Sequence, residues 1–493
     1  MFGLHLTRFH LMMCFIWQFG IYMACQQIFP IFMNYTPAWR CEESEYSKNC
    51  SVVDSCPAQN LSFKAAPFYS AVQEFRLLCG QNAWYASFIS SLQFVGVLVG
   101  TFVLGHLGDR FGRKKITIAC LALGTVVACL SGASPVWQVL AALRFIFGFS
   151  LGGVIVVGFT YVIELILPEQ RLFLRGFFNW GNARVVFTLL CYLVPQWRLA
   201  AAVTALPLIV MILLIAILVP ESPKWLQSTN RHQQATLGLK RIAKFNKQKF
   251  EEEDSQQSLT AKPVGDRRLY TLRDLFATKA LAVRTITLCF IWFTASMSGY
   301  ASDLNSRNLA GDFYLNQFLM AILIAISKVA LFFMDTYIPR FSRRLLHQVP
   351  QLLVCVCYLA IMVLILFGVN KTAPLIITII NIVGIVLIEY TWDACYLCAA
   401  EGFPTVVRGI GVGTCSLMAR VGAILAPQMT FLSNIWQGAP FAAVTVCGLI
   451  SLILSYLYLP ETKGKELNDS LLDNFEPQHE LLALPPKRPP GDE

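Results

Sequence analysis

Twelve long apolar segments limit what this chain can fold into. They lie at about 9–33, 84–106, 116–134, 137–164, 176–195, 197–219, 281–301, 313–334, 347–367, 374–400, 409–431 and 438–459. A helix needs about 20 mostly apolar residues to cross a bilayer. The first segment is longer than the apolar part of a signal peptide and lacks a cleavage site of small residues, so we read it as a spanning helix. Since 56% of the 493 residues are hydrophobic and 14% are charged, we predict an all-α polytopic membrane protein with twelve transmembrane helices.

The distribution of lysine and arginine predicts which side of the membrane each connection faces. The turns at 105–115 and 335–344 are basic, and the segment 220–280 has 12 Lys and Arg against 7 Asp and Glu. Cytoplasmic connections carry an excess of basic residues, so we expect these three and both termini in the cytoplasm. The segment 34–82 has four basic and five acidic residues and is expected outside. The net charge of +10 then reflects orientation in the bilayer, and no nucleic-acid partner is expected.

The expected outside loop carries residues that matter only in an oxidising, glycosylating compartment. Glycosylation sequons begin at Asn34, Asn49 and Asn60, and four of the 16 cysteines lie in the same loop: Cys41, Cys50, Cys56 and Cys79. Sequons are used only in lumenal or extracellular segments. Four cysteines there allow two disulfides in any of three connectivities, which the sequence leaves open.

Three short patterns recur in the same order along the chain. ELILPEQR at 164–171 returns as EGFPTVVR at 401–408, and PESP at 220–223 returns as PETK at 460–463. A looser echo joins DRFGRK to the later PRFSRR. The echoes lie at expected cytoplasmic helix ends, so they predict two six-helix halves of parallel topology with a site near the midplane between them.

The repeats divide the chain into four parts. We predict an N-terminal six-helix half at 1–219 that includes the outside loop, a cytoplasmic linker at 220–280, a C-terminal half at 281–459 and a cytoplasmic tail at 460–493. The linker contains a short helical pattern, RHQQATLGLKRIAKF, and the tail is rich in proline.

The turn after the second helix carries a recognisable motif. GHLGDRFGRKK at 105–115 resembles the G-x-x-x-D-R-x-G-R-K loop of the major facilitator superfamily. Further segments are similar to the organic ion transporters of solute carrier family 22, namely EFRLLCGQNAW, VPESPKWL, AAEGFPTVVRGIGVG and ARVGAILAP. The resemblance covers nearly the whole chain. It implies the major facilitator fold, a small organic ion as substrate and a multi-pass position in the plasma membrane, and it leaves open a coupling ion or counter-substrate.

Charged residues at the cytoplasmic helix ends form two matching sets. The first is Asp109, Arg110, Arg113, Glu164, Arg171 and Glu221, and the second is Asp335, Arg343 with Arg344 beside it, Glu401, Arg408 and Glu461. Such groups can bridge helices while the inner side is closed and separate when it opens. The alternative is that they only anchor helix ends, since exposed pairs contribute about 0–1 kcal/mol each. The resemblance favours the gating role.

Six charged residues are expected well inside the spanning helices: Arg144, Arg184, Lys328, Glu389, Asp393 and Arg420. Charges at this depth are costly and are functional by default. At about 1.5 Å per residue, Arg420 and Glu389 lie roughly 18 Å from the cytoplasmic helix ends, and Lys328 and Asp393 roughly 10–12 Å. Depth therefore predicts two opposite pairs, Arg420 with Glu389 and Lys328 with Asp393. Closed pairs are structural, whereas open ones leave the cations to an anionic substrate.

The family resemblance gives roles to some of these charges. An arginine at the position of Arg420 is typical of the anion and carnitine branches, and a lysine at the position of Lys328 is typical of the anion branch. Glu389 and Asp393 depart from the anion pattern, which keeps zwitterions and cations open. Arg184 matches no family position and either pairs or binds substrate. Arg144 resembles a structural arginine of the fourth helix.

Aromatic side chains are expected to complete a mostly apolar pocket. Trp292, Tyr300 and Trp392 match aromatic pocket positions of the family, whereas Trp180 and Tyr390 rest on spacing alone. Ring faces suit a cation, and stacking surfaces suit an aromatic anion, so these residues do not decide the charge of the substrate.

The helix expected at 409–431 carries a stripe of small residues. Ala419, Gly422, Ala423 and Ala426 fall at i, i+3, i+4 and i+7, so a neighbouring helix can approach closely. Arg420 lies beside that seam.

We expect a secondary active or facilitative transporter of small organic ions that works by alternating access, with anions or carnitine-like zwitterions favoured. One alternative is an organic cation transporter that uses Glu389 and Asp393, and another is a non-transporting receptor on the same fold. An ATP-driven pump or an enzyme is not expected, because no G-x-x-x-x-G-K-[ST] motif occurs and no cytoplasmic segment is large enough for an ATPase domain. No cofactor and no metal site are expected.

Overall fold

The computed structural model describes residues 6–42, 45–48, 50–56, 60–167, 169–248, 271–338, 342–404 and 406–461. Among these residues, eleven helices are long and apolar enough to cross a membrane. They correspond to eleven of the twelve predicted segments, and most extend a few residues further at the ends. Part of this extension comes from capping at the helix starts. The side chains of Thr278, Asp312 and Ser342 accept hydrogen bonds from backbone N–H groups in the first turns of three of these helices.

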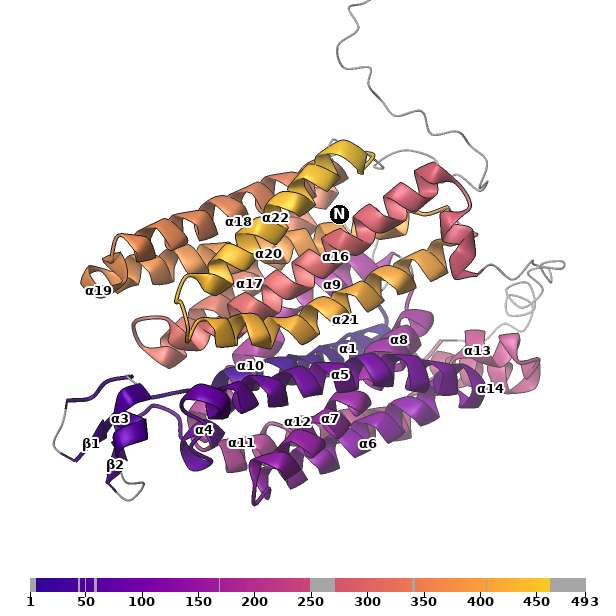
Figure 1. The fold of residues 1–493 in the computed structure, drawn as a ribbon. Coiled ribbons are helices and arrows are strands. Elements are labelled where there is room, and N and C mark those ends of the chain that lie inside the picture. Colours follow the sequence, from indigo (N-terminus) through magenta and orange to yellow (C-terminus); the bar gives the residue numbers. More distant parts are fainter. Residues whose placement is uncertain are drawn as a thin grey trace, which may run out of the picture.

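The first group of spanning helices precedes residue 219. It consists of α1 (Arg8–Cys25), which continues through η1 (Gln26–Ile28) and α2 (Pro30–Met33), then α5 (Gly80–Phe111), α6 (Arg113–Gly132), α7 (Trp137–Gly153) with η2 (Val154–Gly158) and α8 (Phe159–Leu165), α9 (Gln170–Phe177), α10 (Trp180–Leu193), and α11 (Trp197–Val203) with α12 (Leu206–Leu218). The second group consists of α16 (Lys279–Asn305) with η4 (Ser306–Asn308), α17 (Phe313–Tyr337), α18 (Arg343–Leu366), α20 (Pro374–Gly402), α21 (Arg408–Leu432) and α22 (Ala439–Tyr458). Figure 1 shows the second group lying above the first.

The predicted span at 176–195 corresponds to α10, which begins four residues later than predicted and ends at Leu193. The chain breaks between α9 and α10 at Phe178 and Asn179, where the Asn179 side chain accepts a hydrogen bond from the backbone of Asn182 and starts α10 as a new helix. The apolar pattern did not predict where the helix starts, because a single asparagine within an apolar segment can either cap a new helix or lie inside a continuous one. α10 therefore occupies the place of the fifth predicted span, and α9 precedes it as a separate short helix.

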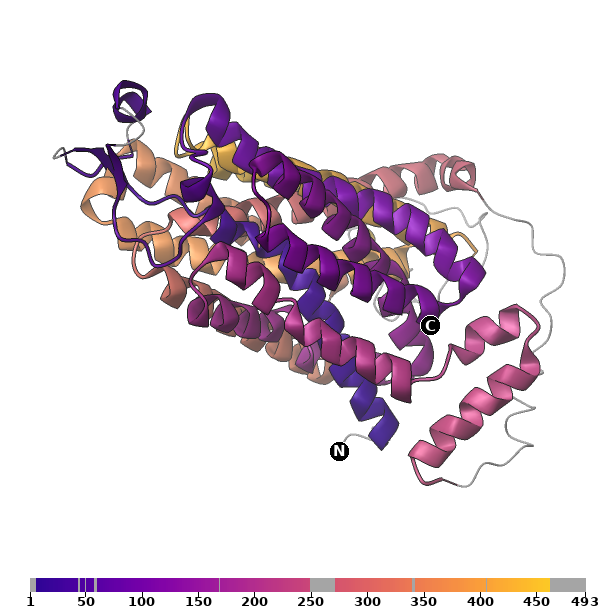
Figure 2. The same ribbon diagram turned by 90° about the horizontal axis from the view of Figure 1, so that it is seen from below.

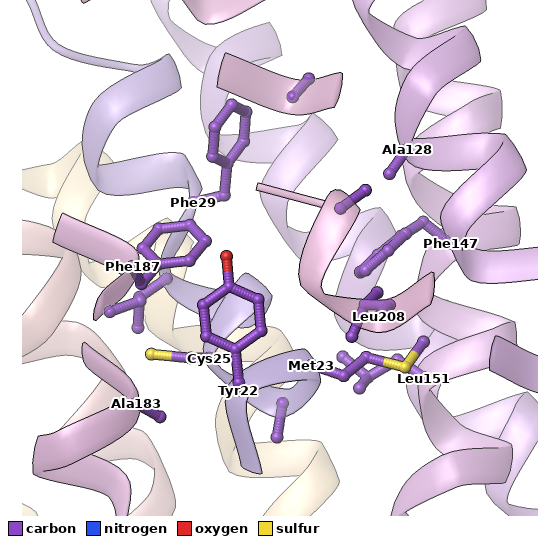
Figure 3. Packing of buried hydrophobic residues seen from close by; sticks show 14 of the residues in the cluster. Tyr22, Met23, Cys25, Phe29, Ala128, Phe147, Leu151, Ala183, Phe187 and Leu208 are labelled. Atoms are coloured by element: carbon purple, nitrogen blue, oxygen red, sulfur yellow. The ribbon is translucent and has the colours of Figure 1, made fainter. Parts of the chain in front are cut away.

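Helices of the first group pack by close backbone approach and by large aromatic side chains. A Cβ atom on Gly148 of α7 would lie 2.0 Å from the carbonyl oxygen of Gln93 in α5, so only glycine fits there. Tyr22, Phe29 and Phe187 fill the space between α1 and α10 (Figure 3). In the second group, α16 packs along α21, and α18 packs between α20 and α22.

The connection at 34–82 forms a small folded unit at one end of the bundle. In it, β1 (Trp39–Cys41) pairs antiparallel with β2 (Leu61–Phe63), and α3 (Cys50–Ser55) and α4 (Ala71–Glu74) flank the pair. The structure joins Cys41 to Cys56 and Cys50 to Cys79, which is one of the three connectivities.

Two of the three sequons differ sharply in exposure. The Asn34 side chain is 3% exposed and donates hydrogen bonds to the Ala86 carbonyl and to Ser90 Oγ. Since a glycan is attached to a free, accessible amide, this conformation of Asn34 offers no room for one, and glycosylation at Asn34 stays a prediction. Asn60 is exposed. Asn49 lies outside the described residues.

The connection between the groups contains α13 (Pro223–Ser228) and α14 (His232–Phe245), the second of which matches the predicted short helix. Both lie at the end of the bundle opposite the small β-sheet (Figure 2). Trp225 fastens α13 to this end by donating a hydrogen bond to the Asp109 carbonyl. A short 3-10 turn, η3 (Leu272–Phe276), then leads into α16, and α19 (Val369–Thr372) links α18 to α20 at the other end. Residues 249–270 of the predicted linker and the tail after residue 461 lie outside the described residues.

Candidate functional site

A cluster of three charges joins α17 to α20 inside the helix bundle. Lys328 Nζ lies 2.8 Å from Asp393 Oδ2 and 2.9 Å from Glu389 Oε2, and it also donates to the Glu389 carbonyl at 3.1 Å. Glu389 and Asp393 are one helical turn apart on α20, so a single lysine can reach both. The predicted pairing of Lys328 with Asp393 is therefore confirmed. The cluster holds one positive and two negative charges.

Arg420 stands apart from that cluster. Its side chain is half-buried on α21 and forms no ion pair with any described residue, and its buried Nε has no hydrogen-bond partner. The predicted pairing of Arg420 with Glu389 is wrong in this structure, because Lys328 takes the Glu389 carboxylate. Counting residues gave the depth of each charge, but the rotation of each helix about its own axis decided which charges meet.

A second ion pair crosses between the two groups of helices. Arg184 of α10 is fully buried, and its Nη1 lies 2.6 Å from Asp303 Oδ1 of α16. Its Nη2 donates to Gln317 Oε1 of α17 at 2.8 Å, and Gln317 in turn donates to Ser306 Oγ. Arg184 therefore pairs, which resolves the choice the sequence left open, and it holds α10 against α16 and α17.

Asp303 was not among the charges predicted inside the membrane. The apolar segment was expected to end at residue 301, whereas α16 continues to Asn305 and brings the carboxylate into the bundle. The residues that follow position 301 are mostly polar, which is typical of a helix end that faces water, so the sequence did not predict that Asp303 is buried. Only a buried arginine on another helix shows that Asp303 is an interior residue.

The predicted aromatic residues take two different places. Trp292 is buried and donates its indole N–H to the Cys395 carbonyl, so it packs inside the second group of helices. Trp392 is half-buried and stacks on Tyr396, whose ring is 41% exposed. The Arg175 guanidinium lies 5.6 Å from the centre of the Tyr396 ring. Tyr396 was missed at the sequence level, although it lies one helical turn after Trp392.

Other predicted residues near mid-membrane make packing or bridging contacts. The Tyr300 hydroxyl donates to Gln27 Oε1 and so links α16 to η1 across the two groups. Trp180 packs against apolar residues of both groups, and Tyr390 packs beside Leu331 and Ala394. Arg144 is buried, with its guanidinium 4.4 Å from the centre of the Phe29 ring. The structure thus gives Arg144 a packing contact with the ring of Phe29.

The charged residues at the helix ends that were predicted to be cytoplasmic form two similar clusters. In the first group, Arg113 Nη2 lies 2.7 Å from Asp109 and its Nε lies 3.6 Å from Glu164, while Glu221 accepts from the Lys114 backbone. These contacts join α5, α6 and α8 to the start of α13. Arg171 donates at 3.5 Å to the Ile163 carbonyl, and Arg110 lies against Phe111.

The second cluster repeats the first with the equivalent residues. Arg343 lies 2.5 Å from Asp335 and 3.3 Å from Glu401, and its backbone N–H donates to Glu461. Arg408 donates to the Phe403 carbonyl. The ion pairs of each cluster join helices within one group. The repeated sequence patterns therefore correspond to the same local arrangement of charges, which occurs once in each group.

Comparisons with known proteins agree with this architecture. The family model described as "Sugar (and other) transporter" matches residues 10–470. The human protein Solute carrier family 22 member 16 is 31% identical over 81% of this chain and 68% of its own length. The chain belongs to solute carrier family 22 of the major facilitator superfamily.

Other family relatives extend the similarity over almost the full length. A Caenorhabditis elegans protein, Uncharacterized protein F23F12.3, is 45% identical over 94% of each chain. Organic cation/carnitine transporter 4 of Arabidopsis thaliana is 28% identical over 97% of this chain and 90% of its own. The inward-open structure of the Escherichia coli xylose transporter XylE is 16% identical, covers 93% of this chain and 98% of its own, and superposes with a TM-score of 0.64.

Membership of solute carrier family 22 decides several predictions. The chain has the twelve-helix major facilitator fold, and α10 lies at the position of the fifth predicted span. It is a multi-pass membrane transporter for a small molecule and not an enzyme. In this solute carrier, the Arg184–Asp303 pair joins the two helix groups, and the Lys328 cluster joins α17 to α20 within the second group.

Proposed function

We propose that this solute carrier moves small organic anions or zwitterions across the membrane by alternating access, and that the charge arrangement favours a carnitine-like zwitterion. The observation that carries the proposal is the position of Arg420. Arg420 has neither a carboxylate partner nor a partner for its Nε among the described residues, and it is half-buried, whereas Arg144, which also lacks both, is 1% exposed and lies against the Phe29 ring. An arginine left open in this way can take a substrate carboxylate through two parallel hydrogen bonds.

The balance of charge supports a substrate that carries both signs. Lys328 with Glu389 and Asp393 sums to one negative charge, Arg184 with Asp303 sums to zero, and Arg420 adds one positive charge. Asp393 is the most exposed member of its cluster, with 29% of its side chain accessible. A zwitterion would match Arg420 with its carboxylate and the excess negative charge of the cluster with its cationic group.

The aromatic pair beside the cluster suits a quaternary ammonium group. Trp392 and Tyr396 present ring surface close to Asp393 on the same helix. Ring faces attract a quaternary ammonium ion, and the attraction is larger where water is excluded. We therefore assign substrate contact to Arg420, Asp393, Glu389 and Trp392, and we assign structural roles to Arg184 and Trp292, which are closed by partners. Lys328 orients the two carboxylates, and Tyr300 lines the contact between the helix groups.

An organic cation transporter is the second candidate. Several relatives are named organic cation transporters, among them two Drosophila melanogaster proteins at 28–29% identity. Such a substrate would use the excess negative charge of Glu389 and Asp393 and would leave Arg420 without a role. The anion and zwitterion proposal is preferred because it accounts for that arginine.

The proposal includes an orientation and a gate. The basic connections, α13 and both termini would face the cytoplasm, and the disulfide-linked loop would face the outside of the plasma membrane. The two clusters around Arg113 and Arg343 would hold helix ends together in one state and rearrange in the other. The four-part division of the chain, with two six-helix halves moving against each other, follows from the same proposal.

Uptake measurements test the proposal directly. Cells expressing the chain are given labelled carnitine, a labelled aromatic carboxylate and a quaternary amine that has no carboxylate. Replacing Arg420 with Gln should lower uptake of the two carboxylates at least tenfold, because their partner is removed, whereas Arg420→Lys should keep part of it. The exposed Arg273→Gln is the matched control and should transport normally.

Two outcomes would contradict the proposal. If the quaternary amine is the best substrate and the Arg420→Gln variant takes it up unchanged, the cation alternative is correct. If the folded protein at the cell surface binds the probes but moves none of them, the chain is a receptor on a transporter fold.

A further inference from the structure

A cavity lies at the end of the bundle that carries the disulfide-linked loop. Its volume is about 870 Å³, and its walls come from both groups of helices. The 34–82 loop and the start of α5 form one side, and η4, α20 and the ends of α21 and α22 form the other. Polar members of the lining include Asn34, Lys48, Asn305, Arg307, Asn370 and Asn434.

The charge of this cavity has one sign. Lys48 and Arg307 are the charged residues among its described lining, and neither forms an ion pair with a described residue. Lys48 belongs to the loop of the first group, and Arg307 belongs to η4 of the second. Desolvation by the surrounding protein, and then the neighbouring Arg307 guanidinium, lower the pKa of Lys48. Lys48 is exposed and Arg307 is half-buried. Two cations that line one cavity without a carboxylate among its described lining repel one another, and an anion between them would relieve that repulsion.

The rest of the lining fits an organic anion better than a bare ion. Side-chain amides such as Asn308 and Gln437 supply neutral hydrogen-bond donors, and Phe431 and Phe441 supply apolar surface. Pockets for small organic molecules combine mostly apolar walls with a few placed polar groups. An organic cation would meet the positive charge of Lys48 and Arg307 with no compensating carboxylate among the described lining.

The floor of the cavity is continuous with the ion pair that joins the helix groups. Asn305 and Arg307 line the cavity, and Ser306 between them accepts a hydrogen bond from Gln317, which holds Arg184. Asp303, the partner of Arg184, lies on the same segment of chain. A ligand in the cavity therefore sits on the outer side of a closed contact, on the path that opens when Arg184 and Asp303 separate.

We propose that this cavity is an outer binding site for the carboxylate of an organic anion or zwitterion, held between Lys48 and Arg307 before it passes to Arg420. The inference rests on the proposed function for the nature of the substrate. The site raises the local concentration of carboxylates at the outer entrance and discriminates against simple cations there.

Kinetics of uptake test the outer site. The double variant Lys48→Gln/Arg307→Gln should raise the KM for carnitine at least fivefold and leave Vmax within twofold, because central binding and turnover are untouched. The matched control is Lys64→Gln/Lys371→Gln, which removes the same charge from exposed residues outside the cavity and should leave KM unchanged. An unchanged KM in the first variant, or an equal rise in both, would overturn the inference.

A binding measurement separates this inference from the proposed function. Carnitine should raise the melting temperature of the purified full-length protein in detergent, and a smaller rise should persist in Arg420→Gln and disappear when Lys48→Gln/Arg307→Gln is added. If cells show no uptake but this pattern holds, the outer site stands and the transport proposal fails. If Arg420→Gln abolishes uptake and the outer double variant has normal KM and normal melting, the transport proposal stands and the outer site fails.

Discussion

Arg184 and Asp303 show how a charge is held at the meeting point of two helix groups. The arginine is fully buried, and its hydrogen-bonded partners at Asp303 and Gln317 lie on the other group. A buried ion pair gives little net stability over an apolar pair of similar size, but removing one partner leaves an uncompensated charge. The pair therefore acts as a specific contact between the groups, and it must separate whenever they part at this level.

Replacing one member of this pair should be worse than replacing both. Asp303→Leu leaves Arg184 buried and unpaired, and should destabilise the protein by about 3–5 kcal/mol. Arg184→Leu/Asp303→Leu removes both charges and should recover most of that loss. Melting of the purified protein in detergent measures both effects. Equal melting temperatures for Asp303→Leu and the unmodified protein would show that water or another group already satisfies Arg184.

Helix α21 illustrates how one element positions a functional side chain. Its predicted stripe of small residues is buried, with Ala419 at 4% exposure and Ala423 and Ala426 at 0%. A Cβ atom on Gly422 would lie 2.4 Å from the Phe293 carbonyl oxygen, so α16 approaches the α21 backbone directly. The prediction of close packing is confirmed. This contact sets the rotation of α21 and with it the direction of Arg420.

Two glycines of α21 should therefore respond differently to the same change. Gly422→Ala forces α16 and α21 apart, and overpacking of this kind costs about 1–3 kcal/mol. Gly413→Ala meets open space within 4 Å, and it should be neutral or stabilising by up to about 1 kcal/mol because alanine favours a helix. Melting in detergent distinguishes them. A Gly422→Ala variant as stable as Gly413→Ala would mean that the helices adjust without strain.

At the scale of the whole molecule, polar contacts between the two helix groups lie in the interior, whereas the charged clusters around Arg113 and Arg343 lie at helix ends and stay within one group. Ser91 of α5 donates to the Ile424 carbonyl of α21, and Tyr300 donates to Gln27, so polar bonds join the groups in the interior. The clusters around Arg113 and Arg343 each stay within one group. A transporter that alternates between two states can keep such clusters in one state and rearrange them in the other.

Weakening one cluster should slow the cycle more than it weakens binding. Asp109→Asn removes the charge that lies 2.7 Å from Arg113, and we expect turnover to fall several-fold while the Kd for substrate changes less than twofold. Uptake rates and binding to purified protein give the two quantities. Glu169→Gln, an exposed carboxylate at the start of α9, is the control and should behave normally. Loss of binding in a folded Asp109→Asn protein would contradict the gating role.

Local chemistry decides which features of this protein are readable in the sequence. Twelve apolar segments, the basic connections and the internal echoes predicted the helices and the repeated clusters, because hydrophobic length and charge near a helix end depend on neighbouring residues alone. The small-residue stripe of α21 was predicted from spacing along one helix, and the Lys328–Asp393 pair was predicted from the matching depth of two residues on different helices.

Tertiary structure decided the rest, because helix rotation and the meeting of distant segments are set by packing. Depth along two helices placed Arg420 level with Glu389, yet Lys328 binds that carboxylate and leaves Arg420 open. Asp303 became an interior partner only through Arg184 on another helix. The disulfide connectivity within the 34–82 loop was left open by the sequence, and the cavity lined by Lys48 and Arg307 joins segments far apart in the chain. The sequence determined that the chain spans a membrane as two repeated halves, and packing alone decided which charges remain free to meet a substrate.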